Sequence, residues 1–169
     1  GVEDIAIGSL QGVFLYDITG KQIWTKPHDA EPSLFPTYQS HSGPSLCAVG
    51  DANADGLPDL AVGLKSAGQR RSGLVWILDG AKGSILHEVE AVQGNAFGAS
   101  LEFLGDIDSS GVGSLAIGAP STSIHKNGKV YVSSVASSKP WLALEAPSSY
   151  PTFGFAMAKT REENANVCL

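Results

Sequence analysis

The stretch Gly50-Asp51-Ala52-Asn53-Ala54-Asp55-Gly56-Leu57-Pro58-Asp59 decides how this sequence is interpreted. Oxygen-bearing side chains alternate along it, and Gly56 permits the sharp turn that points them at one centre. The expected ligands are the side chains of Asp51, Asn53, Asp55 and Asp59 and the backbone carbonyl of Leu57. An all-oxygen set suits a hard cation, and its modest total charge favours calcium over magnesium. The alternative is a solvated acidic turn, because Asp, Asn and Gly are ordinary turn residues.

Composition indicates a globular, all-β chain. The 169 residues suffice for one ordinary domain, and 43% of them are hydrophobic. Only 17% are charged, 20 are glycine, and no apolar spacing of 3.6 is sustained, which favours short strands over helices. The net charge of −6 weighs against nucleic-acid binding, and no apolar run is long enough to span a membrane. Cys47 and Cys168 form neither a metal-type pair nor a disulfide framework.

The decisive stretch belongs to a repeat. Residues 105–118 match residues 50–63 position for position, so that Asp106 corresponds to Asp51 at an offset of 55 residues. Residues 1–8 match residues 56–63 at the same offset. Three copies at a fixed step indicate a repeat architecture rather than a single irregular fold.

Each copy consists of short apolar runs separated by turns. The expected strands are residues 4–8, 13–16 and 22–24 in the first copy, 46–49, 59–63, 74–78 and 85–89 in the second, and 101–104, 114–118, 129–132 and 141–144 in the third. Four short strands in a unit of about 55 residues predict the blades of a β-propeller. A solenoid is the rival, but its period is usually shorter.

The third copy resembles the FG-GAP repeat, which builds the propeller of integrin alpha subunits and related extracellular proteins. It carries Phe97-Gly98-Ala99-Ser100 and Gly118-Ala119-Pro120 intact. The second copy departs from the pattern, with Ser42-Gly43-Pro44-Ser45 and Gly63-Leu64-Lys65 at the matching places. A degenerate fourth copy begins at Phe153-Gly154. The resemblance divides the chain into a partial blade at 1–41, blades at 42–96 and 97–152, and the start of a fourth repeat at 153–169, which is an incomplete ring.

The resemblance also implies structural calcium in the loop that joins the first two strands of a blade. In the third copy the matching ligands are Asp106, Asp108, Ser110, the Val112 carbonyl and Ser114. This loop has two carboxylates where the second copy has three, so we expect weaker binding, and an empty turn is the alternative. Only Asp4 remains of the ligand set in the first copy, and no ion is expected there.

The function that follows is a non-catalytic, calcium-binding propeller segment used in adhesion or protein interaction, with an extracellular or cell-surface location implied by the resemblance. A protein partner, or the remainder of the propeller, is expected to cover the faces of the terminal blades. The alternatives are an accessory propeller of a secreted hydrolase, similar to the phospholipase that cleaves glycolipid anchors, and a carbohydrate-binding propeller. No nucleophile elbow or P-loop appears, and the four histidines are scattered. The tryptophans expected to pack between blades are Trp24, Trp76 and Trp141.

Overall fold

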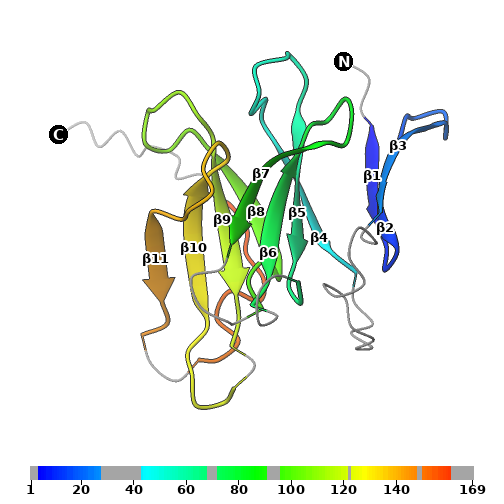
Figure 1. The fold of residues 1–169 in the computed structure, drawn as a ribbon. Helices are drawn as coiled ribbons and strands as arrows, with labels where there is room; N and C mark the ends of the chain where they lie inside the picture. Colours follow the sequence, from blue (N-terminus) through cyan, green and yellow to red (C-terminus); the bar gives the residue numbers. More distant parts are fainter. Residues whose placement is uncertain are drawn as a thin grey trace.

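The chain folds into three antiparallel sheets that lie side by side (Figure 1). The computed structural model describes residues 4–27, 43–67, 72–90, 96–121, 123–147 and 150–160. The first sheet holds β1 (Ile5–Gly8), β2 (Gly12–Tyr16) and β3 (Gln22–Pro27). The second holds β4 (Ser45–Val49), β5 (Asp59–Leu64), β6 (Leu74–Leu78) and β7 (Ile85–Glu90). The third holds β8 (Ser100–Gly105), β9 (Ser114–Ala119), β10 (Lys129–Ser134) and β11 (Leu142–Glu145).

The all-β prediction is confirmed. In each sheet the strands pair in the order of the sequence, as a meander, and each of the eleven expected apolar runs coincides with a strand. The second and third sheets have four strands and the first has three, which is consistent with the blades of an incomplete propeller. No helix long and apolar enough to cross a membrane occurs in the part of the chain that the structure describes.

The middle sheet is covered on both faces, which explains why its two central strands, β5 and β6, are mostly apolar at successive positions. Every residue of β5 and β6 is buried. One face, with Val62 and Leu78, packs against Val13 and Trp24 of the first sheet. The opposite face, with Val75 and Ile77, packs against the third sheet. A sheet that is buried on both faces needs apolar side chains at successive positions, not at alternate ones.

The Phe-Gly signature has a packing role. Phe97 is fully buried between the second and third sheets and meets the ring of Tyr131 edge to face at 5.4 Å. Gly98 follows with a φ of 84°, and its carbonyl accepts the Ser45 hydroxyl at 2.7 Å. A Cβ on Gly63 would lie 2.1 Å from that carbonyl oxygen. Glycine at both positions therefore lets the turn of one blade lie against the strand of the preceding blade.

The same arrangement recurs at Phe153 and Gly154. Gly154 has a φ of 84°, and its carbonyl accepts the Ser100 hydroxyl at 2.7 Å. A Cβ on Gly118 would lie 2.0 Å from that carbonyl oxygen. Phe153 is only half-buried, whereas Phe97 is fully buried, because no described sheet follows it. The fourth copy thus begins with the turn geometry of the third.

Trp24 and Trp76 are buried between the first two sheets as expected, but Trp141 is 52% exposed and precedes β11. The prediction for Trp141 was wrong because this residue adjoins β11, whose four residues are all exposed, whereas Trp24 and Trp76 lie between two described sheets. Cys168 and two of the four histidines, His28 and His41, lie outside the described ranges.

Candidate metal-binding loops

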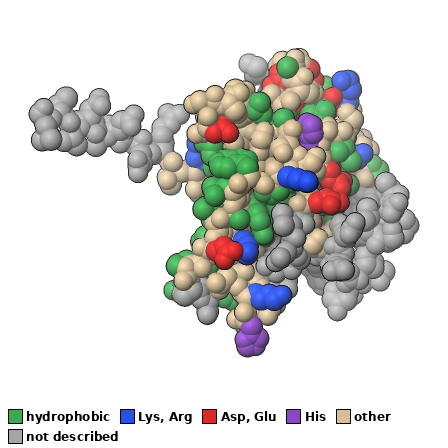
Figure 2. All heavy atoms as spheres, turned by 60° about the vertical axis from the view of Figure 1, so that its left-hand side comes forward, with side chains coloured by type: hydrophobic (Ala, Val, Ile, Leu, Met, Phe, Trp, Pro, Cys, Tyr) green, Lys and Arg blue, Asp and Glu red, His purple; other side chains and the backbone are tan. Residues whose placement is uncertain are grey.

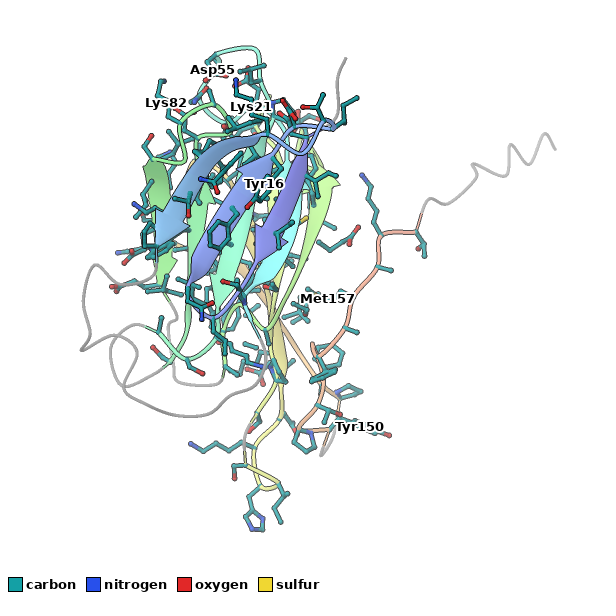
Figure 3. All side chains as sticks on the ribbon, turned by 90° about the vertical axis from the view of Figure 1, so that its right-hand side faces the viewer. Tyr16, Lys21, Asp55, Lys82, Tyr150 and Met157 are labelled. Atoms are coloured by element: carbon teal, nitrogen blue, oxygen red, sulfur yellow. The ribbon has the colours of Figure 1, made fainter. Side chains whose placement is uncertain are left out.

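Two loops of matching sequence lie at the same end of the molecule (Figure 1). The first loop, residues 50–59, joins β4 to β5, and the second loop, residues 105–114, joins β8 to β9. The resemblance to the FG-GAP repeat predicts cation loops at these two connections. Figure 3 shows Asp55 of the first loop at this end, together with Lys21 and Lys82 from neighbouring turns.

Asp51 organises the first loop. Its Oδ1 accepts the backbone N–H of Asp55 at 3.1 Å and its Oδ2 accepts that of Gly56 at 2.7 Å. These bonds require a tight turn, in which Ala54 has a φ of 63° and Gly56 a φ of 87°. The hydrogen bond from Gly56 is the main reason that the pKa of Asp51 lies below its usual value. Asp51 is therefore a carboxylate that stays ionised and is fixed by the loop backbone.

The side chains of Asn53 and Asp55 also accept hydrogen bonds from the backbone of the first loop. Asn53 Oδ1 accepts the backbone N–H of Asp55 at 2.9 Å, and Asp55 Oδ1 accepts that of Leu57 at 2.9 Å. Asn53 also donates from its amide nitrogen to Asp55 Oδ2 at 3.1 Å. Each oxygen has a second lone pair beyond these bonds. The negative charge of the loop also acts on Lys82. The pKa of Lys82 is raised mainly by Asp79 and to a lesser degree by Asp55.

Asp59 differs from the other acids of the first loop because it is only 2% exposed. Its Oδ2 accepts the backbone N–H of Ala52 at 2.8 Å, which closes the loop on itself. Its Oδ1 accepts the backbone N–H of Gly80 at 2.9 Å, which lies in the turn between β6 and β7. Asp59 thus joins the loop to a distant turn of the same sheet.

The second loop repeats the turn closely. Asp106 accepts the backbone N–H groups of Ser110 at 3.0 Å and Gly111 at 2.9 Å. Asp108 Oδ1 accepts the Ser110 N–H at 3.1 Å, and Ser109 has a φ of 58°, close to that of Ala54. The pKa of Asp108 is lowered, first by the hydroxyl of Ser110. The prediction of two matching turns agrees with this geometry.

The second loop lacks the bonds made by Asp59. Ser114 occupies the matching position, is 1% exposed, and its hydroxyl oxygen has no hydrogen-bond partner. Val135, which matches Gly80, donates its N–H to the carbonyl of Gly113 at 2.9 Å instead. The Val112 carbonyl, an expected ligand, accepts the Ser110 hydroxyl at 3.4 Å. The second loop is therefore a poorer donor set for a cation.

The donor chemistry of the first loop fits a hard cation. Within the described ranges, no three His, Cys, Asp or Glu side chains gather as a metal-binding group. The first loop offers the carboxylates of Asp51 and Asp55, the amide oxygen of Asn53 and the backbone carbonyl of Leu57. Carboxylate, amide and carbonyl oxygens are the ligands that calcium takes, whereas zinc prefers nitrogen and sulfur.

Part of the chain is similar in sequence to known proteins. No family model matches it. Integrin alpha pat-2 of Caenorhabditis briggsae is 35% identical over 46% of this chain, and the protein of the same name from Caenorhabditis elegans is 34% identical over the same share. The chain contains a segment similar to an integrin alpha subunit. The matched part is 7% of the length of each relative.

Sequence reasoning missed two residues, Gly80 and Trp24, that extend the hydrogen bonding of the first loop. The Trp24 indole N–H donates to the Gly80 carbonyl at 2.8 Å. Gly80 contributes only backbone groups, so its sequence position carries no chemical signal.

Proposed function

We propose that this chain is a non-catalytic segment of a β-propeller that binds calcium structurally in the first loop and serves as a scaffold for protein interaction in adhesion. The observation that carries the proposal is that Asp51 Oδ1 and Asn53 Oδ1 both accept the backbone N–H of Asp55, which brings these oxygens together at the connection between β4 and β5. The similarity to integrin alpha pat-2 supports the propeller and an extracellular or cell-surface setting.

The first loop would hold the ion with the side chains of Asp51, Asn53 and Asp55 and the carbonyl of Leu57, with Asp59 closing the shell. The second loop would bind more weakly through Asp106, Asp108, Ser110, the Val112 carbonyl and Ser114. When bound, the ion supplies positive charge between fixed carboxylates and does no chemistry on a substrate. The chain's own residues then hold the loop against the sheet, because binding to the folded state alone stabilises that state.

Calorimetry tests the ion. Calcium chloride titrated into chelator-treated protein should release or absorb heat, and the melting temperature should rise as calcium is added. At a calcium concentration about 100 times the Kd, linkage predicts about 2.7 kcal/mol of added stability. Asp51→Asn is the matched variant, because it keeps the size of the side chain and removes one charge. Unchanged melting and no binding heat would refute the calcium site.

The interaction role needs a separate test. Hydrophobic side chains gather on one face of the molecule (Figure 2). Leu142 and Leu144 of β11 are 38% and 46% exposed, and Phe155 of the following segment is 70% exposed. Such a face is typical of a protein contact or of contact with a further blade. Cell attachment to the immobilised protein should require calcium and decline for Asp51→Asn. Attachment no greater than to an albumin-coated surface, with calcium bound, would contradict the adhesion role and leave the ion site intact.

A further inference from the structure

A continuous line of hydrogen bonds runs from the first loop to the neighbouring sheet. Asp59 Oδ1 accepts the N–H of Gly80 at 2.9 Å, and the carbonyl of the same Gly80 accepts the indole N–H of Trp24 at 2.8 Å. Trp24 lies in β3 of the first sheet, 56 residues from Gly80, and is 8% exposed. One glycine residue is thus held on one side by the loop and on the other by the adjacent blade.

Close packing fixes the turn that carries this glycine. A Cβ on Gly80 would lie 2.0 Å from the carbonyl oxygen of Pro58 in the first loop. A Cβ on Gly83 would lie 2.8 Å from two ring carbons of Trp24. The buried Asp79 accepts the N–H groups of Ala81 and Lys82 at 2.8 and 3.0 Å. A displacement of the first loop therefore displaces the turn between β6 and β7, on which Trp24 packs. The contacts are too close for the loop to move alone.

Among the residues that the structure describes, the second loop has no counterpart of this connection. Ser114 makes no hydrogen bond from its hydroxyl, and Val135 donates to the backbone of Gly113. The connection is therefore not a general property of the repeat but belongs to the first loop and the first sheet.

We propose that Asp59 is a positioning residue that couples the calcium state of the first loop to the docking of the first sheet through Gly80 and Trp24. This inference rests on the proposed function, since it requires an ion in the loop. An ion held by Asp51, Asn53, Asp55 and Asp59 fixes the loop, and Asp59 also restrains the Gly80 peptide group, because its Oδ1 accepts the Gly80 N–H. By linkage, a docked Trp24 then raises the affinity of the loop for calcium, because coupling between two sites is reciprocal.

Reciprocity supplies the first test, made by titrating calcium chloride into the protein in a calorimeter. Trp24→Phe removes the indole donor and leaves every residue of the first loop in place. Its calcium affinity should fall about fivefold, the equivalent of one lost hydrogen bond. Trp141→Phe is the matched control, since Trp141 is exposed on the third sheet, and its calcium affinity should equal that of the wild type. Equal affinity in Trp24→Phe and wild type would overturn the coupling.

Hydrogen exchange of the indole N–H groups is the second test and needs no variant that has to fold. At a calcium concentration about 100 times the Kd, exchange at Trp24 should slow by up to about a hundredfold, and by more than at Trp76. Trp76 is the internal control because its indole donates to Glu88 within the second sheet, at 2.8 Å. Equal slowing at both indoles would overturn the coupling. No binding heat in the wild type would refute the calcium site itself, so the two failures are distinguishable.

Discussion

The first and second loops share a turn but differ in how they are tied to the protein. In both, an aspartate at the first position accepts the N–H groups of the fifth and sixth residues, at 3.1 and 2.7 Å in one and 3.0 and 2.9 Å in the other. At the ninth position, Asp59 bonds to two backbone N–H groups, whereas the Ser114 hydroxyl has no partner. The turn is therefore determined within the loop, while its attachment depends on one buried side chain.

The largest effect is expected from removing that attachment. Asp59→Ala leaves the N–H groups of Ala52 and Gly80, both half-buried residues, without their acceptor. Because an unsatisfied buried group costs about 1–3 kcal/mol and water partly reaches these two, the free energy of unfolding should fall by about 1–3 kcal/mol. Urea denaturation in the presence of a chelator measures it. Asp59→Asn retains one acceptor oxygen and should lose less; an equal loss in both variants would argue against the hydrogen bonds as the cause.

The next largest effect is expected from placing an aspartate in the second loop at the position that matches Asp59. Ser114→Asp adds a third carboxylate to that loop, and its calcium affinity should rise about tenfold, because affinity follows the charge and rigidity of the ligands. Without calcium the variant should be less stable than the wild type, since it buries a charge beside Asp106 and Asp108. Calorimetry and melting with and without calcium check both signs. An unchanged affinity would show that Ser114 lies outside the ion shell.

The comparison also shows what the sequence could predict. The strands followed from short apolar runs between turn residues, and the turn of each loop followed from Asp51, Gly56 and their counterparts, because these are local effects. The attachment of Asp59 to Gly80 joins residues 21 apart, and that of Trp24 to Gly80 joins residues 56 apart through a backbone carbonyl. Neither bond leaves a pattern in the sequence. The exposure of Trp141 was missed because burial depends on whether a facing sheet exists.

A smaller, pH-dependent effect should appear in both loops. The backbone N–H of Gly56 lowers the folded-state pKa of Asp51 below its ordinary 3.8, and the Ser110 hydroxyl does the same for Asp108. A lowered folded-state pKa means that the stabilisation is present above the unfolded value and is lost as the pH falls through the folded one. Melting followed from about pH 5 to pH 2 should therefore decline less steeply in Asp51→Asn and in Asp108→Asn than in the wild type. Parallel curves would contradict the assignment.

The smallest effect is expected from removing the Ser114 hydroxyl, at the position where the two loops differ most. Ser114→Ala removes a buried hydroxyl oxygen that has no hydrogen-bond partner, whereas Asp59→Ala removes two bonds at the matching position. Since an unpartnered buried polar group contributes desolvation cost and no bond, the free energy of unfolding should stay within about 0.5 kcal/mol of the wild type or rise. Urea denaturation in chelator measures this, and repetition in calcium separates structure from ligation. A loss that appears only with calcium would make the Ser114 hydroxyl a ligand of the second loop.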